Sequence, residues 1–377
     1  MAIDPDVALV LNKINGRLDL LSHRLDKLEA APLPTPTPPE PPTPTEVPRE
    51  QLHHRPNPEH HDHGFNSRIG RGWGIYPNFH RKPDTWKKLN DYIDSIGGNW
   101  PNVLMASCSG ASTHNAGGAY WGQFVGPQAY LPDLVHKIET VEIIHPLNFG
   151  RAGRGKTAAG QHEVHGELLE VAKGRDDEWH KRQAERLIEA GYPHAIIRLG
   201  NESDGMHSAS TYQGNADNAK AFIDAYRHVA GVLQSVSPDF EFSWCIMSGT
   251  WGRGLAQPGY PGDDVVDYCS MDTYYRTGHA LTDDESAKFH SIWKDHHQFA
   301  KSRGKRVAYS EYMSTSTQDT RWMDEFWKWH DSLGDDLAWA AVFSSGGHDG
   351  GFTYDLKEYP AIYQAWRDRF SQDRFKH

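Results

Sequence analysis

The sequence predicts that most of the chain folds as a (β/α)8 barrel. Eight short apolar runs follow residue 70, and most are separated by stretches with the periodicity of an amphipathic helix. Eight strands that alternate with helices over about 300 residues are typical of this fold. Residues that favour helix starts or ends flank the helical stretches: Pro83, Asp283 and Asp319 at starts, and Gly97, Gly191 and Gly304 at ends. A doubly wound sheet is the alternative, although eight strands are many for it.

The apolar runs give the expected elements in chain order. We expect strands at residues 72–76, 102–107, 140–147, 194–199, 241–247, 265–273, 306–311 and 337–344. We expect helices at residues 83–96, 176–190, 216–235, 283–302, 320–333 and 359–370. The second strand–helix unit is the weakest, because residues 111–125 are rich in glycine and are typical of a loop.

A separate helix is predicted near the N-terminus, where residues 1–30 have the pattern of a coiled coil. Isoleucine at one seam position and leucine at the other favour three or more strands, so we expect a homotrimer through residues 7–28. An amphipathic helix that docks on its own chain is the alternative. The apolar seam residues alternate at spacings of four and three: Val7, Leu11, Ile14, Leu18, Leu21, Leu25 and Leu28.

Residues 31–66 are predicted to be a linker between this helix and the barrel domain, residues 67–377. Nine of the 17 residues from 32 to 48 are proline, which favours an extended polyproline II spacer. Five histidines lie between residues 53 and 63. They are compatible with a metal site, but the neighbouring prolines and the absence of cysteine favour a solvated linker.

Composition and charge exclude several classes of function. The chain has 50 acidic and 39 basic residues and a formal charge of −11, which disfavours a nucleic-acid partner. No apolar run reaches the roughly 18 residues of a membrane-spanning helix, so no membrane insertion is expected. Three cysteines cannot all pair within one chain, which excludes a disulfide scaffold. The 13 tryptophans argue for a folded chain.

Two of the expected strands end in a glutamate. The fourth strand leads into Asn201 and Glu202, and the seventh leads into Glu311. Active sites of (β/α)8 barrels lie at the C-terminal ends of the strands. Two carboxyl groups that face each other there can act as acid and nucleophile on a glycosidic bond. One strand-end glutamate is often only a surface cap, but two on these strands predict such chemistry.

These residues resemble the retaining glycoside hydrolases of the large (β/α)8-barrel clan. Residues 198–205, RLGNESDG, are similar to the motif of glycoside hydrolase family 26, and residues 260–274 are similar to its sixth strand. The resemblance implies a retaining, endo-acting β-glycosidase such as a mannanase. It implies that Glu202 is the acid/base, that Glu311 is the nucleophile about 5 Å away, and that Tyr274 binds the nucleophile. Asn201 departs from the family, which has histidine there.

Further residues are expected to contact a polysaccharide substrate, because aromatic faces stack on sugars and polar groups bind hydroxyls. For each aromatic residue, packing within the barrel is the competing interpretation. Arg198 is better suited to orient a carboxylate than to touch substrate. No cofactor and no metal ion are expected. The expected substrate-binding residues are Asn201, Arg198, Tyr274, Trp244 at the end of strand five, His145, Trp339 and Trp73.

Two other functions compete with catalysis. Residues 150–157, GRAGRGKT, match the phosphate-binding P-loop pattern and follow an expected strand. A P-loop leads directly into a helix, whereas Gly160 and Gly166 are expected to delay the next helix, so nucleotide binding is the weaker alternative. The other alternative is a non-catalytic, carbohydrate-binding barrel that has kept both glutamates.

The N-terminal segments also predict where the protein works. The apolar stretch at residues 7–11 is too short for a secretion signal and follows two aspartates. We therefore expect a virion component, such as a bacteriophage tail or fibre protein, that is released by lysis. The coiled coil would attach several barrels to other virion proteins, and the barrels would bind the host surface multivalently.

Overall fold

The structure, a computed structural model, describes much of the region predicted to be the barrel. The described residues are 72–76, 93–94, 98–107, 138, 140–147, 158–205, 211–212, 216–276, 279–314, 319–343 and 360–372. The chain divides into two units, Met1–Glu46 and Val47–His377, and all of the described residues belong to the second. The predicted coiled coil at residues 7–28, the linker at 31–66 and the motif at 150–157 lie outside the described residues.

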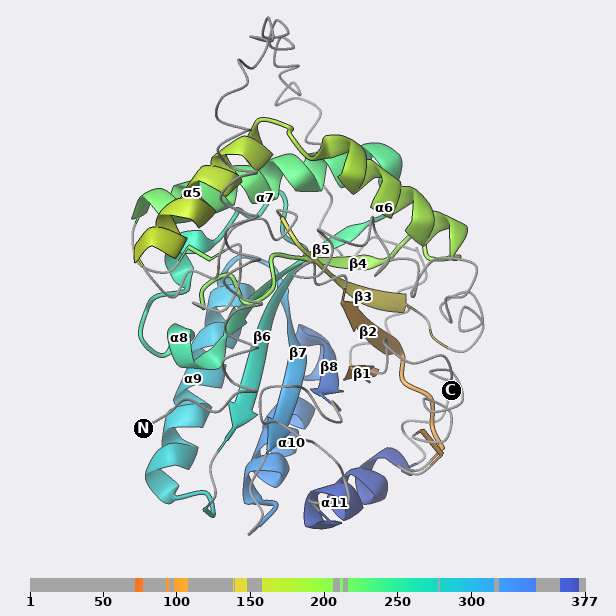
Figure 1. Cartoon of the computed structure of the whole chain (residues 1–377). Helices are drawn as coiled ribbons and strands as arrows, with labels where there is room; N and C mark the ends of the chain where they lie inside the picture. The colour runs from red at the N-terminus through yellow and green to blue at the C-terminus, as the bar shows by residue number, and fades with distance from the viewer. Residues whose placement is uncertain are drawn as a thin grey trace, which may run out of the picture. The chain divides into compact units, whose positions relative to one another are not determined.

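Eight parallel strands form a closed barrel in sequence order, and β8 pairs with β1 to complete it (Figure 1). This confirms the predicted (β/α)8 fold. The strands are β1 (Gly72–Tyr76), β2 (Val103–Ser107), β3 (Thr140–His145), β4 (Ile196–Leu199), β5 (Glu241–Met247), β6 (Tyr268–Tyr275), β7 (Arg306–Ser314) and β8 (Leu337–Phe343).

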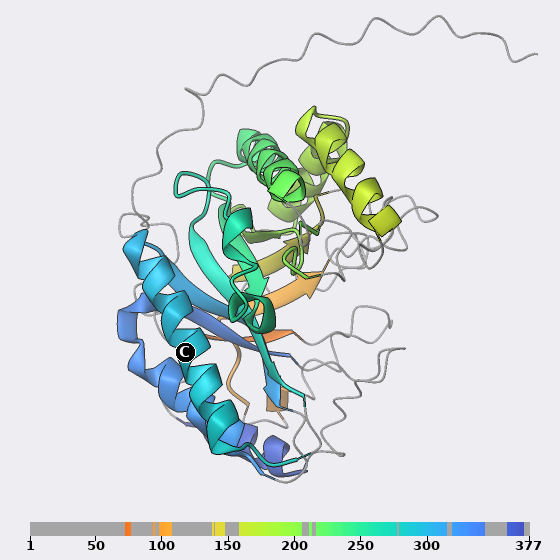
Figure 2. The ribbon, with the colours of Figure 1, turned by 90° about the vertical axis from the view of Figure 1, so that its left-hand side faces the viewer.

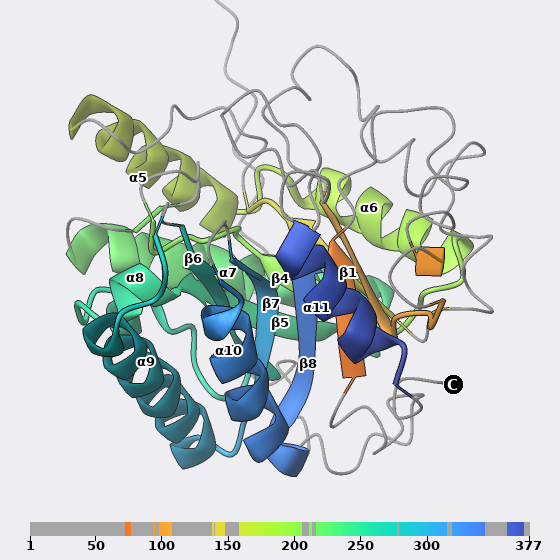
Figure 3. The same ribbon diagram turned by 90° about the horizontal axis from the view of Figure 1, so that it is seen from below.

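Helices surround the strands in two groups. Helices α5, α6 and α7, drawn in green, lie on one side of the strands, and α9, α10 and α11, drawn in blue, lie on another (Figures 1 and 2). The view from below shows α9, α10 and α11 in succession along the barrel (Figure 3). None of the described helices is both long and apolar enough to cross a membrane. The helices are α5 (Ala158–Ala172), α6 (Asp177–Glu189), α7 (Ala216–Val236), α8 (Ser248–Trp251), α9 (Asp283–Ser302), α10 (Arg321–Ser332) and α11 (Pro360–Phe370), with 3-10 turns η5 (Gln257–Gly259) and η6 (Gly334–Asp336).

Most of the expected bounds agree with the structure, and strand β6 shows why some differ. We expected this strand to begin at residue 265, but it begins at Tyr268. The backbone N–H groups of Val265 and Val266 both bond back to the carbonyl of Gly262, at 3.3 and 3.2 Å. These apolar residues therefore form a turn before the strand, although both are buried.

The expectation that glycines delay the helix after residue 157 is wrong. Helix α5 begins at Ala158 and contains both Gly160 and Gly166. It packs against α7, and its residues Val164 and Leu168 are fully buried. This burial outweighs the cost of about 1 kcal/mol for each glycine within a helix. The early start of α5 does little to support the alternative of nucleotide binding by a P-loop, because the sheet is a closed barrel and not an open, doubly wound sheet.

The strands separate two apolar cores because their side chains alternate between the faces of the barrel. The inner core includes Met105, Ile144, Tyr268 and Trp339. The larger outer core lies between the strands and the helices, and Trp244 of β5 belongs to it. Polar residues replace apolar ones in the interior near the C-terminal ends of β4, β6 and β7, which is where the candidate site lies.

Candidate active site

The turn after β4 carries Asn201 and Glu202 in an unusual backbone conformation. Gly200 has a φ of 71° and Glu202 a φ of 43°, and no other non-glycine residue described here has a positive φ. The carbonyl of Glu202 accepts a hydrogen bond from the N–H of Gly205 at 2.8 Å. Left-handed backbone at a glutamate is strained, and such residues persist where the surrounding structure holds them, often at functional sites.

Asp204 fixes this turn to the end of β5. Its carboxylate accepts the backbone N–H of Met247 at 2.9 Å and the hydroxyl of Thr250. Burial raises the pKa of Asp204 to about 7. Asp204 was not among the predicted site residues, although its place two residues after Glu202 was a usable signal.

Glu311 lies at the C-terminal half of β7 and is 7% exposed. Arg198 of β4 donates through Nη1 to Glu311 Oε1 at 2.9 Å, and the Tyr274 hydroxyl of β6 donates to Oε2. Both oxygens therefore accept hydrogen bonds, which suits the ionised carboxylate. Tyr274 binds Glu311 as the resemblance implied.

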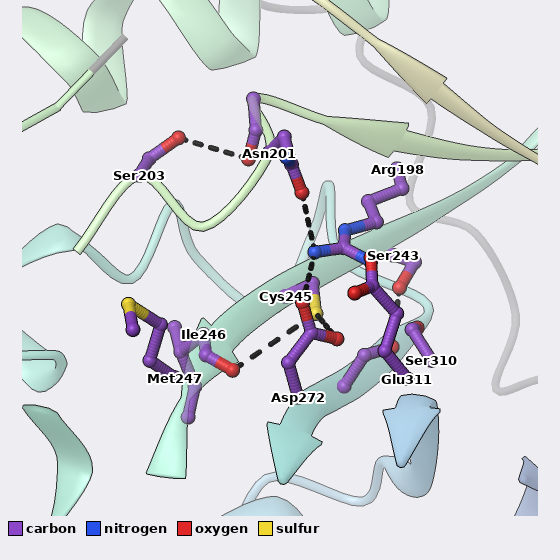
Figure 4. A network of polar contacts seen from close by, with 12 residues as sticks. Arg198, Asn201, Ser203, Ser243, Cys245, Ile246, Met247, Asp272, Ser310 and Glu311 are labelled. Carbon is purple, nitrogen blue, oxygen red and sulfur yellow. Dashed lines mark hydrogen bonds and ion pairs between the residues drawn. The ribbon is translucent and has the colours of Figure 1, made fainter. Parts of the chain in front are cut away.

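Arg198 joins the strands of the site (Figure 4). Its side chain is fully buried, and Nη2 donates to the Asn201 Oδ1 atom at 2.6 Å and to Asp272 of β6. Asp272 also accepts a hydrogen bond from the Cys245 thiol at 3.1 Å. Arg198 thus orients a carboxylate, as expected, and it fixes Asn201 and Asp272 as well.

The surroundings of Glu202 favour its protonated form. Burial raises the pKa of its carboxyl group, and the negative charge of Glu311 raises it further. The charges of Arg198 and Arg276 and a hydrogen bond with Asp272 partly oppose this rise. A hydrogen bond between two carboxyl groups requires a proton on one of them. Burial raises the pKa of the Asp272 carboxyl as well, so Glu202 and Asp272 together are suited to hold a proton beside Glu311.

Three of the expected substrate-binding residues do not lie at this site. Trp73 stacks on Phe370 of α11, with ring centroids 4.2 Å apart. Trp244 lies in the middle of β5, not at its end as we expected, and its ring meets Tyr260 of the outer core. His145 ends β3, but its Nε2 atom lies 2.7 Å from Nδ1 of His180 on α6.

Trp339 faces the barrel interior, but it is fully buried. Its Nε1 atom donates to Glu142 of β3 at 3.1 Å, and its ring contacts that of Tyr268. Glu142 was not among the predicted site residues, although it is the single charged residue in the apolar run 140–147. In the described part of the chain, no group of three or more potential ligands is arranged to hold a metal ion.

Comparisons with known proteins support the fold. No protein-family model and no curated protein matches the chain. The catalytic domain of a family 26 endo-β-1,4-mannanase from Bacillus sp. JAMB-750 matches with a TM-score of 0.64 and 15% identity, covering 83% of this chain and 89% of that one. A family 26 β-mannanase from Bacteroides ovatus matches with a TM-score of 0.57 and 14% identity, covering 84% and 92%.

An endo-β-1,4-mannanase double mutant from Cellulomonas fimi is also similar, with a TM-score of 0.54 and 17% identity. The match covers 76% of this chain and 66% of that one, so this chain spans less than two thirds of its length. At these identities the likeness establishes the fold: the chain is a (β/α)8 barrel of the kind found in these mannanases.

Proposed function

We propose that the protein is a glycoside hydrolase that cleaves a polysaccharide by double displacement. The observation that carries this proposal is the opposite environment of two carboxyl groups at the C-terminal ends of β4 and β7. Glu311 accepts hydrogen bonds on both oxygens, whereas burial raises the pKa of Glu202. Paired carboxyl groups whose surroundings separate their protonation states are typical of nucleophile and general acid.

In this mechanism Glu311 attacks the anomeric carbon while Glu202 protonates the departing glycosidic oxygen. A glycosyl ester then forms on Glu311, and the loss of its negative charge removes one cause of the raised pKa of Glu202. Glu202 can then take a proton from the incoming water, which releases the product. Tyr274 and Arg198 hold Glu311 in the attacking orientation.

Asn201 is the residue best placed to bind a sugar hydroxyl. Arg198 only donates hydrogen bonds, so the oxygen of the Asn201 amide must face it, at 2.6 Å. The NH2 group at the other end of the amide can donate to the substrate. Two of the similar solved structures are family 26 mannanases, and we propose an endo-acting β-glycosidase, with mannan as the first of several polysaccharides to test.

The experiment is a screen against mannans, glucans, galactans and bacterial surface polysaccharides, with product analysis. Glu202→Gln and Glu311→Gln should each lower turnover by about three or more orders of magnitude while the barrel stays folded. Glu241→Gln is the matched control. Glu241 is also buried, but it starts β5 at the other end of the barrel, where it binds the Tyr268 hydroxyl at 2.9 Å. Unchanged turnover in both site variants would contradict the proposal, and binding without cleavage by the wild type would favour a lectin-like barrel.

We further propose that the protein is a virion component acting on a host surface. The support is the heptad pattern at residues 7–28 and the proline-rich spacer at 32–48, which together suit a trimeric stalk that presents several barrels. Detection of the chain in purified particles by mass spectrometry tests this role. Its absence from particles that contain the other tail proteins would contradict it.

A further inference from the structure

Strand β7 contains one extra residue beside the proposed nucleophile. Along β6, the pairing with β7 advances two residues from Ser270 to Asp272, while β7 advances three, from Ala308 to Glu311. The pairing with β8 shifts twice: from Leu337 to Ala340 the extra residue is in β8, and from Tyr309 to Tyr312 it is in β7, next to Glu311. The two pairings place a β-bulge at residues 309–311.

The bulge turns two consecutive side chains toward the barrel interior. Neighbouring residues of a regular strand point to opposite faces, yet Ser310 bonds Glu142 in the interior and Glu311 bonds Arg198 across it. Bulges re-aim side chains in this way, often next to active sites. The side chain of Glu311 therefore points into the barrel interior because of the bulge.

Glu142 holds the bulge from the opposite wall of the barrel. Its side chain is fully buried on β3. The Ser310 hydroxyl donates to its Oε1 atom at 2.7 Å, and Trp339 Nε1 donates to its Oε2 atom at 3.1 Å. Each carboxylate oxygen thus binds a different strand, β7 or β8. The mechanism proposed above gives Glu142 no part in the chemistry, so this buried acid needs another role.

We infer that Glu142 is a positioning residue, which directs Glu311 at the substrate by holding Ser310 and the bulge of β7. The inference rests on the proposed function only in naming Glu311 as the nucleophile. Glu142 also lies near Arg198, whose positive charge and whose hydrogen bond to Glu311 complete the site. A small displacement of a reacting group, of about 1 Å, can lower a rate by about 100-fold.

Three variants separate the hydrogen bonds of Glu142 from its charge. Ser310→Ala removes the bond to the bulge and leaves the charge. Glu142→Leu removes both bonds and the charge. Glu142→Gln removes only the charge, because its amide oxygen can accept from Trp339 and its NH2 group can donate to Ser310. Ser243→Ala is the matched control, since Ser243 is a buried interior serine of β5 whose hydroxyl bonds that of Ser270.

The first measurement is hydrogen exchange of the backbone at residues 306–314, which needs no substrate. We expect faster exchange in Ser310→Ala and Glu142→Leu, and wild-type exchange in Glu142→Gln and Ser243→Ala. Wild-type exchange in both of the first two variants, or equal acceleration in Ser243→Ala, would overturn the inference. If Glu142→Leu does not fold, Ser310→Ala decides the result.

The second measurement is steady-state kinetics on a cleaved polysaccharide. We expect Ser310→Ala to lower kcat by about 10- to 100-fold with little change in KM, because the nucleophile is misdirected and substrate binding is not. Glu142→Gln should keep most of kcat, because its amide can keep both hydrogen bonds of the side chain. Wild-type kcat in Ser310→Ala would overturn the inference. Exchange decides the role of Glu142 even if no polysaccharide is cleaved, so failure of the proposed function is a separate result.

Discussion

Arg198 of β4 and Glu311 of β7 form a buried ion pair across the barrel, with Nη1 2.9 Å from Oε1. The same guanidinium binds Asp272, so one cation compensates two carboxylates of different strands. The pair therefore links the stability of the barrel to the arrangement of its candidate site, and a change at Arg198 should affect both.

Replacement of Arg198 tests this link. Arg198→Met should lower the free energy of unfolding by about 3–5 kcal/mol, because it leaves buried carboxylates without their counter-charge. The loss should be smaller in mild acid, where protonation of those carboxyl groups relieves the repulsion. Urea unfolding at two pH values measures it. Arg253→Met, at an exposed arginine after α8, should change stability by less than about 0.5 kcal/mol.

Tyr274 should matter for turnover more than for stability. Tyr274→Phe removes the hydroxyl that donates to Glu311 Oε2, and we expect kcat to fall by about 100-fold with a small change in Tm. Tyr275→Phe is the control, because Tyr275 is the next residue of β6 and its hydroxyl donates to the Ala280 carbonyl at 3.1 Å or to Glu285 at 3.0 Å instead of to Glu311. Equal losses of kcat in the two variants would mean that Tyr274 has only a packing role.

Strand positions could be predicted from the sequence, but the face that each side chain occupies could not. Barrel strands are buried on both faces, so they read as continuous apolar runs without alternation. Trp244 and His145 were therefore expected at the site, although both face the helices. Ser243 and Cys245, on either side of Trp244, lie on the interior face of β5. Their polar side chains were the available sign in the sequence that Trp244 faces the helices.

The two glutamates and Arg198 were predictable because charged residues at the ends of apolar strands stand out. The bulge that directs Glu311 was not, because nothing in the run RVAYSEYMS marks an extra residue. Helix α5 was missed for a related reason. Its glycines weaken the helical pattern locally, while the burial against α7 that stabilises it depends on tertiary structure.

Three buried histidines predict sensitivity to acid. Burial lowers the pKa of His145 well below its ordinary value, that of His180 to about 4 and that of His296 to about 3. In the unfolded chain they titrate near about 6.5. Above that pH the neutral histidines cost the folded state no stability. Below it, the free energy of unfolding falls by up to about 1.4 kcal/mol per pH unit for each histidine, until the pKa of the folded state is reached.

The buried carboxyl of Asp204, whose pKa is about 7, has the opposite effect in the same range. Unfolding measured from about pH 7.5 down to pH 4.5 is therefore compared between the wild type and a variant that lacks a single histidine. His296→Leu removes a fully buried imidazole on α9. We expect the stability of this variant to fall less steeply with acid than that of the wild type. Parallel curves for the two proteins would show that His296 does not contribute to the acid sensitivity.

Residues 7–28 should determine the oligomeric state, because their apolar seam needs other copies to bury it. Removal of residues 1–48 should give a folded monomer, whereas the full chain should sediment as a trimer. Leu18→Asp in the full chain places a charge in the seam and should also give monomers. An unchanged oligomer in both proteins would locate the interface in the barrel.

The stereochemistry of cleavage tests the roles of the two glutamates together. In a double displacement the nucleophile lies about 5 Å from the acid/base, so no water fits between Glu311 and the anomeric carbon, and the product keeps its configuration. An NMR time course should show the retained anomer first. With substrates whose leaving groups need no acid, Glu202→Ala should recover activity in azide, which replaces the water that Glu202 no longer activates. Glu311→Ala should not recover retaining activity in this way, because it lacks the nucleophile. Inverted product appearing first would mean a single displacement, and Glu311 would then act as a base on water.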